Sequence, residues 1–247
     1  MRALLSMIGL LLCLSALRAQ SPDYSSYEYM YKKEPVNDSA ANKKNSYQHQ
    51  NTYADGIDTA KVIGFAIAPL YRKQPESPLG NLMADCMKLY AEKIYNTHVD
   101  AAFVNYSGMR YYIPKGEITI GALNKVMPYD NKIVLLTIPG NVFKQFLEHQ
   151  ASLGGWPCAG VAMTVKNSQL INVVVDNQPF DEAKSYTIAV ADYLAKGGNQ
   201  CTMLKGLPMV DKNYLFRTAL VDYIISFTQA GKPVVAAIEN RIVYINE

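Results

Sequence analysis

Apolar positions recur in two different periods along most of the chain, from about residue 61 onward. Between Pro78 and Tyr95 they return mostly at steps of three and four, which is the spacing of an amphipathic helix, and Pro78 suits the first helical turn. The same criterion predicts helices over Thr119–Met127, Asn141–Gln150 and Leu215–Phe227.

Shorter runs rich in apolar and β-branched side chains predict strands. The predicted strands are Lys61–Leu70, Val99–Asn105, Lys132–Ile138, Val161–Val165, Ile171–Val175, Tyr186–Ala191 and Arg241–Ile245. A turn is expected at Asp176–Gln178. Because helices and strands are interspersed without a strict βαβ rhythm, the pattern favours an α+β fold with mixed sheets and flanking helices.

The pattern is different before residue 56. Residues 1–19 have a basic start at Arg2, an apolar run over Leu4–Leu14 and small residues at Ala16 and Ala19, so we interpret them as a signal peptide. The apolar run is shorter than the roughly 20 residues of a membrane span, although a membrane anchor is the competing interpretation. Residues 20–55 are polar and predict a flexible linker, which leaves one domain over 56–247. The protein is therefore expected to be exported, to a periplasmic or extracellular location.

Composition and charge limit the kinds of function that this chain can have. With 49% hydrophobic residues, a net charge of only +3 and scattered Lys and Arg, the chain suits a globular domain without a nucleic-acid partner. Three cysteines follow the signal peptide, and whether Cys158 and Cys201 pair is left open, while Cys86 lies in a helical pattern as a predicted buried thiol. No group of Cys or His has metal-ligand spacing, so no metal site is predicted on this chain.

Four segments carry a more specific signal. They are Glu76-Ser-Pro-Leu-Gly-Asn-Leu-Met-Ala-Asp85, Asn105-Tyr-Ser-Gly-Met-Arg110, Ile118-Thr-Ile-Gly-Ala-Leu123 with Met127-Pro-Tyr-Asp-Asn131, and Asp192-Tyr-Leu-Ala-Lys-Gly-Gly-Asn199. With these four segments in this order, the chain resembles the C-terminal, substrate-binding domain of the 5′-nucleotidase and UDP-sugar hydrolase family. The resemblance covers about residues 61–245.

The resemblance also implies what this chain does not supply. Full-length family members begin with a metallophosphatase domain that holds two metal ions, and His49, His98 and His149 stand in none of its motifs. We therefore expect a nucleotide-binding subunit of a split 5′-nucleotidase, inactive alone, without cofactors of its own. A separate metallophosphatase chain would carry the divalent metals. The alternative is a catalytically silent, exported ligand-binding or interaction module. A monomeric hydrolase with an unrecognised mechanism has the least support.

The resemblance assigns the phosphate of a nucleoside monophosphate, or of a related phosphoester, to basic and amide side chains. Arg110 matches the family's phosphate-binding Arg, whose planar fork fits phosphate oxygens, and Asn105 matches the family's site Asn. A second family Arg is replaced by Lys73, with Arg72 beside it.

The base and the ribose have their own candidates. Tyr129 and Tyr193 fall on the positions of the two aromatic rings that sandwich the base in the family. Asn199 replaces the ribose-binding Asp, and an amide both donates and accepts hydrogen bonds. Glu148 and His149 are adjacent on a predicted helix and do not face each other, so we predict no acid–base pair there.

Overall fold

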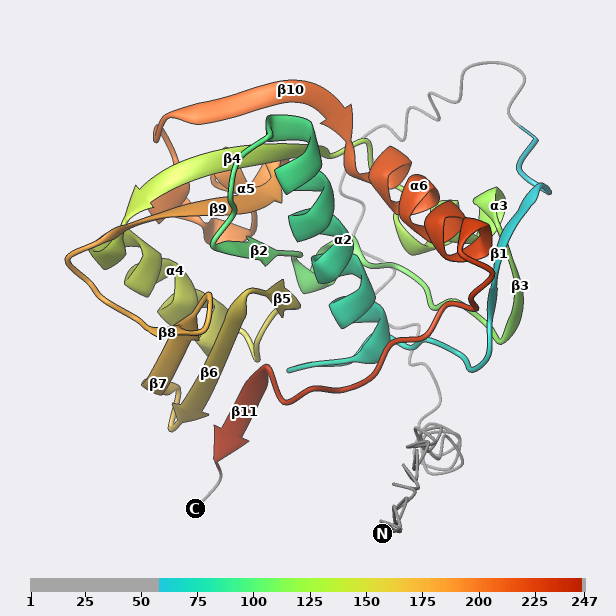
Figure 1. Cartoon of the computed structure of the whole chain (residues 1–247). Coiled ribbons are helices and arrows are strands. Elements are labelled where there is room, and N and C mark those ends of the chain that lie inside the picture. The colour runs from blue at the N-terminus through green and yellow to red at the C-terminus, as the bar shows by residue number, and fades with distance from the viewer. Residues whose placement is uncertain (1–57, 246–247) are drawn as a thin grey trace, which may run out of the picture. The chain divides into compact units, whose positions relative to one another are not determined.

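We describe the protein from a computed structural model, which defines residues 58–245. The predicted signal peptide and linker lie outside the described residues. None of the helices in the described part is both long and apolar enough to cross a membrane. Figure 1 shows the arrangement of the helices and strands.

A five-stranded mixed sheet forms the centre of the domain. In spatial order its strands are β10 (Met209–Leu215), β4 (Lys132–Pro139), β9 (Ser185–Ala191), β2 (Ala101–Phe103) and β5 (Cys158–Ala159). All neighbouring pairs are antiparallel except β2 and β9, which run parallel with Ala102 opposite Ala189.

Apart from the exposed edge strand β10, both faces of this sheet are buried, and successive side chains of a strand join the cores on opposite sides. On β4, Ile133 and Leu135 join the core formed with α2 (Pro78–Tyr95) and α6 (Phe216–Gln229). Val134 and Leu136 join the core formed with α4 (Gly140–Ser152). A strand buried on both faces has a continuous apolar run, which is why the sequence pattern of β4 was easy to interpret.

Two smaller sheets and several short helices complete the domain. Strands β11 (Ile242–Ile245), β6 (Val161–Lys166), β7 (Gln169–Val175) and β8 (Gln178–Pro179) form one sheet, and β1 (Val62–Ala66) pairs with β3 (Gly116–Thr119). The short helices are α3 (Ile120–Val126), α5 (Asp192–Ala195) and the 3₁₀ turns Tyr106–Gly108, Gly198–Gln200 and Thr202–Leu204.

The α+β class predicted from the sequence is confirmed, and α2 begins and ends where its periodicity placed it. Ser77 caps this helix by accepting a hydrogen bond from the Gly80 N–H, which fits a serine directly before a first-turn proline. The predicted strand Lys61–Leu70 is only β1, and Val99–Asn105 is only β2, because Val104 already bonds to the Pro157 carbonyl outside the sheet.

The three cysteines of the described part remain unpaired with one another. Cys86, Cys158 and Cys201 are all buried free thiols, so Cys158 and Cys201 do not form a disulfide. Burial raises the pKa of Cys158 and of Cys201 to about 12, and keeps both thiols neutral at ordinary pH. A thiolate is the nucleophilic form of cysteine, so neither side chain is suited to covalent catalysis.

Candidate functional site

The strand directions bring several of the candidate residues to one end of the central sheet. Because β2 and β9 run parallel and β4 runs antiparallel to β9, the ends of β2 and β9 lie beside the start of β4. Asn105 follows β2, Tyr193 follows β9 and Tyr129 precedes β4. The sheet therefore collects residues from three separate motifs, which sequence order alone places far apart.

The turn after β2 is built around Asn105. This side chain is only 5% exposed, and its Nδ2 donates to the hydroxyl of Ser107 at 3.1 Å. A Cβ at Gly108 would lie 2.9 Å from the Asn105 Oδ1, so a larger residue there would displace the amide. This packing explains why a glycine stands at position 108.

Asn199 lies against this turn. Its Nδ2 donates to the Ser107 hydroxyl at 3.0 Å, and its Oδ1 is 3.5 Å from the Asn105 Nδ2. Its backbone has a φ of 52°, a left-handed conformation that asparagine tolerates better than most residues. The structure thus brings two predicted residues, Asn105 and Asn199, into one hydrogen-bonded group with Ser107.

Tyr193 is 42% exposed and lies beside the same loop. Its hydroxyl accepts a hydrogen bond from the Asn199 backbone N–H at 3.1 Å. A Cβ at Gly198 would lie 2.5 Å from two ring atoms, so the ring packs directly on the glycine backbone. Gly198 thereby holds the ring in place while part of it stays open to solvent.

Tyr129 lies in the segment between α3 and β4 and is half-buried. Two contacts from the start of α6 hold the residues that follow Tyr129. The Phe216 N–H donates to the Asn131 carbonyl at 2.9 Å, and Arg217 forms an ion pair with Asp130. The Lys132 N–H, next along the chain, donates to the Asp192 carboxylate at 2.9 Å. These contacts place the two tyrosine-bearing segments side by side.

The basic candidates approach the Asn105 turn from outside. Arg110 is exposed, with Nη1 3.4 Å from the Ser107 carbonyl. Arg72 donates from Nη1 to the Met109 carbonyl at 2.6 Å, and its guanidinium lies 4.9 Å from the centre of the Tyr106 ring. Each contact uses few of the five guanidinium donors. Lys73 follows Arg72 in the chain and is exposed.

His149 is the functional candidate that sequence reasoning missed. It lies on α4, and its Nε2 is 2.8 Å from the Asn199 carbonyl. Nothing in the local sequence pattern of His149 points to a loop 50 residues away. Its observed role is to hold the loop that carries Asn199.

A cavity of about 10 Å³ lies behind Asn105, between the start of α6 and the turn after β2. That volume holds about one water molecule, whereas pockets that enclose a small ligand measure roughly 300–1,000 Å³. Tyr193, Ser107 and Arg110 do not line this cavity and are exposed at the protein surface. A ligand there would need a second surface to enclose it.

Comparisons with known proteins agree with this picture. The family model for the 5′-nucleotidase C-terminal domain matches residues 57–206. Protein UshA of Salmonella pullorum is 28% identical in an alignment of 157 positions that covers 60% of this chain and 28% of that protein. Snake venom 5′-nucleotidase of Macrovipera lebetinus is 26% identical in an alignment of 236 positions that covers 82% of this chain and 55% of that protein.

Among solved structures, a 5′-nucleotidase precursor from Thermus thermophilus aligns with a TM-score of 0.67 and 27% identity. This alignment covers 76% of this chain and 40% of the Thermus chain. The chain thus spans less than two thirds of the length of each of these relatives.

Proposed function

Because the chain belongs to the 5′-nucleotidase C-terminal domain family, we propose that it binds the nucleotide in a split 5′-nucleotidase. In this proposal the protein is exported, and it presents a nucleoside monophosphate, or a related phosphoester, to a separate metallophosphatase chain. Divalent metal ions on that partner would supply the hydrolytic chemistry. The export proposal rests on the N-terminal sequence pattern alone.

The observation that carries the proposal is the convergence of Asn105, Arg110, Tyr193 and Asn199 at one end of the central sheet. A nucleotide has a phosphate, a ribose and a flat base, and these four residues offer a fork of N–H donors, two amides and an aromatic face. The proposed pose places the phosphate near Arg110 and Asn105, with Arg72 and Lys73 as further cations.

The base would stack on Tyr193, and Tyr129 is the proposed second ring. A planar base gains about 1–3 kcal/mol from each aromatic contact, whichever base it is. The ribose hydroxyls would meet Asn199, which is neutral, so the contact lacks the charge-assisted strength that a carboxylate would give. Substrate positioning, rather than bond cleavage, is the work proposed for this chain.

Calorimetry with AMP and adenosine tests the phosphate role. Arg110→Ala is expected to weaken AMP binding by about 1.5–3 kcal/mol, roughly 10- to 150-fold, and to leave adenosine binding almost unchanged. Lys184→Ala is the matched control, because Lys184 is an exposed cation directly before β9, at the opposite end of the sheet. Equal losses for AMP and adenosine in Arg110→Ala would refute the phosphate role.

The alternative function, a catalytically silent binding or interaction module, has one observation in its favour. Asn199 already has partners for both ends of its side-chain amide, in Ser107 and Asn105, so it is held as a structural residue would be. Failure of wild-type protein to bind adenosine, AMP and every other phosphoester tested would favour this alternative.

A further inference from the structure

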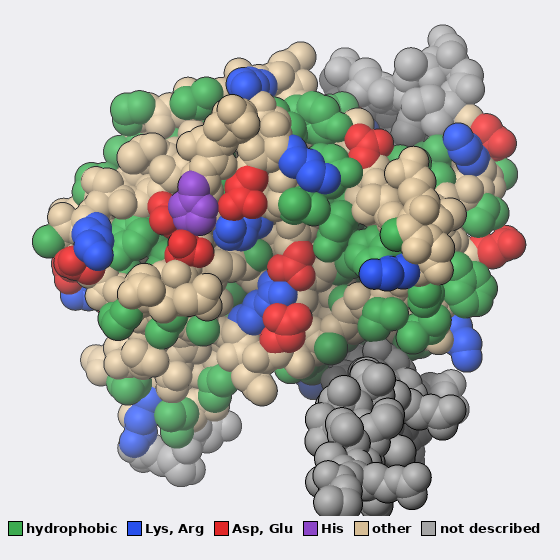
Figure 2. All heavy atoms as spheres, viewed as in Figure 1, with side chains coloured by type: hydrophobic (Ala, Val, Ile, Leu, Met, Phe, Trp, Pro, Cys, Tyr) green, Lys and Arg blue, Asp and Glu red, His purple; other side chains and the backbone are tan. Residues whose placement is uncertain are grey.

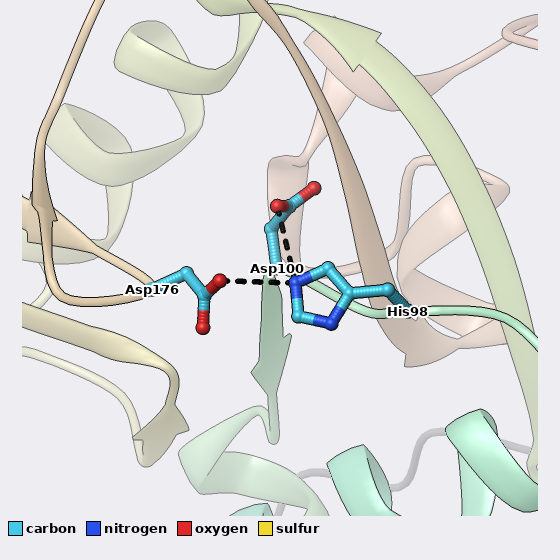
Figure 3. Close-up of side chains that lie close together, drawn as sticks. All are labelled: His98, Asp100 and Asp176. Atoms are coloured by element: carbon cyan, nitrogen blue, oxygen red, sulfur yellow. Dashed lines mark hydrogen bonds and ion pairs between the residues drawn. The ribbon is translucent and has the colours of Figure 1, made fainter.

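A second group of chemically active side chains lies at the opposite end of β2 from Asn105. His98 is in the loop between α2 and β2, Asp100 directly precedes β2, and Asp176 begins the turn between β7 and β8. Figure 2 shows a histidine among acidic side chains on the surface, and Figure 3 labels this group. The group shares no residue with the proposed nucleotide site.

The distances within this group fit shared coordination of one ion. The His98 Nε2 lies 3.0 Å from the Asp176 Oδ2 and 3.6 Å from the Asp100 Oδ1, and the three ligand atoms all lie within 4.8 Å of one another. Figure 3 shows the imidazole nitrogen directed between the two carboxylates. Ligands that each lie about 2.0–2.2 Å from a zinc ion are about 3.0–3.5 Å apart in common geometries, so small side-chain movements would complete the site.

Backbone contacts hold the Asp100 carboxylate and the backbone of Asp176 in position. The Asp100 Oδ2 accepts the Thr187 N–H at 2.6 Å, which leaves Oδ1 directed to His98. The Asp176 N–H donates to the Gly160 carbonyl at 2.8 Å. Gly160 itself has a φ of 74°, and a Cβ there would lie 2.2 Å from the Asp100 carbonyl oxygen. A glycine is therefore required for the two aspartate-bearing segments to approach each other.

The other ring nitrogen of His98 also faces a carboxylate. Its Nδ1 is 3.8 Å from the Glu92 Oε1, which the Lys88 ammonium contacts at 2.6 Å. A carboxylate on the far side of an imidazole favours a proton on that nitrogen, and it leaves the other nitrogen's lone pair for a metal. At 3.8 Å this contact is longer than a hydrogen bond, so Glu92 would orient a metal-binding His98 as an outer carboxylate after a small movement toward the ring.

We propose that His98, Asp100 and Asp176 bind one Zn²⁺ ion, with water in the remaining coordination position. One imidazole and two carboxylates form a mixed nitrogen and oxygen ligand set. This set suits Zn²⁺ better than Ca²⁺ or Mg²⁺, because those two ions prefer ligands that are all oxygen atoms. The bound ion joins the loop after α2 to the β7–β8 turn. Sequence spacing concealed the site, because Asp176 lies 78 positions from His98.

Titration of untagged, folded protein with ZnCl₂ in a calorimeter tests this proposal, with MgCl₂ and CaCl₂ as comparison salts. Wild-type protein is expected to bind one Zn²⁺ per chain, and its melting temperature is expected to rise by at least about 2 °C with excess zinc. His98→Ala and Asp176→Asn are each expected to weaken zinc binding at least about 10-fold and to abolish the melting shift. Glu92→Gln is expected to weaken binding to a smaller extent.

Asp181→Asn is the matched acidic control, because the Asp181 carboxylate is 46% exposed and lies after β8, outside the group. This variant is expected to bind zinc like wild-type protein. Titration with Co²⁺ separates these ligands from the three thiols, since thiolate ligation would give an intense sulfur-to-cobalt absorption band. Absence of zinc binding by the wild type, retention of binding in His98→Ala, or a thiolate band would each overturn the proposal. The group would then be an ion pair between histidine and two aspartates.

Discussion

At the residue scale, the hydrogen-bond partners of Asn199 explain why an amide is suited to this position. Its Nδ2 donates to the Ser107 hydroxyl, and its Oδ1 faces the Asn105 Nδ2. A carboxylate at this position only accepts hydrogen bonds when ionised, whereas an amide does both. Asparagine therefore suits the internal hydrogen bonds of this loop, while the family's aspartate suits a ribose. A ribose that binds Asn199 must therefore compete with Ser107 and Asn105 for the same side-chain amide.

Tyr193 gives the sharpest prediction at this scale. Tyr193→Ala is expected to weaken AMP and adenosine binding alike, by about 1–3 kcal/mol, because both share the base that stacks on the ring. Tyr193→Phe is expected to retain most of the affinity, since it keeps the ring and loses only the hydroxyl that accepts the Asn199 N–H. Calorimetry of both variants measures the difference. A Phe variant as weak as the Ala variant would show that the hydroxyl, through the loop, is what matters.

At the scale of elements, one carboxylate fixes the segment between α6 and β11 to the start of α2. Glu76 is 6% exposed and accepts the backbone N–H groups of Glu239 at 2.7 Å and Arg241 at 2.9 Å. The Arg241 guanidinium meets Asp85 with two hydrogen bonds, of 2.7 and 2.9 Å. Figure 1 shows this segment passing the beginning of α2 on its way to β11. The Glu76–Asp85 motif thus holds the fold together.

Replacing Glu76 tests this role. Glu76→Gln is expected to lower the free energy of unfolding by about 1–3 kcal/mol, because the amide loses the charge that two backbone donors share in a buried place. Thermal unfolding measures the loss, and hydrogen exchange of the Glu239 and Arg241 amides is expected to accelerate. Glu239→Gln is the control, because its carboxylate is largely exposed and its pair with Arg241 is worth only about 0–1 kcal/mol. Equal effects of the two substitutions would contradict the assignment.

At the scale of the whole molecule, burial couples stability to alkaline pH. Burial raises the pKa of Cys158 and of Tyr223 to about 12, and raises the pKa of Cys86 well above its ordinary value. The unfolded chain releases a thiol proton near pH ~8.5, so above that pH it holds fewer protons than the folded chain. Stability is therefore fully present below about pH 8.5 and is lost as the pH rises toward about 12.

Urea unfolding at about pH 7.5 and about pH 10 measures this dependence, since these values lie on either side of the thiol pKa of an unfolded chain. The free energy of unfolding is expected to fall with pH by about 1.4 kcal/mol per pH unit for each fully buried thiol. The double variant Cys86→Ala/Cys158→Ala is expected to show a shallower fall than wild-type protein. The same slope in both proteins would show that Cys86 and Cys158 do not cause the alkaline loss.

The proposal that this chain binds the nucleotide and a separate chain hydrolyses it leads to a prediction about activity. The purified chain with added divalent metals is expected to release no phosphate from AMP, whereas adding a metallophosphatase chain of the same family is expected to produce or raise hydrolysis. A phosphate-release assay with each chain alone and with both measures this. Metal-dependent hydrolysis by this chain alone, lost on mutating one of its residues, would contradict the proposal. So would a partner whose rate is independent of this chain at every AMP concentration.

Elements with strong local signals could be predicted from the sequence, and elements with weak ones could not. Strand β10 was missed because its middle is polar and exposed at Asp211, Lys212 and Asn213, as suits the edge of a sheet. Strands β3, β5 and β8 are four residues or shorter, and α5 has only four residues. Such short elements depend on partners from elsewhere in the chain, so their own residues carry little periodicity.

The sequence by itself determined the α+β class, the limits of α2 and the four motifs of the family, because capping, periodicity and motif order are local properties of the chain. Only the tertiary structure decided that His149 reaches the Asn199 carbonyl, 50 residues away, and that Asp176 meets His98, 78 residues away. Contacts at such separations depend on which strands pair and in which register. That choice is made by burying both faces of the central sheet at once, and no single segment of sequence contains it.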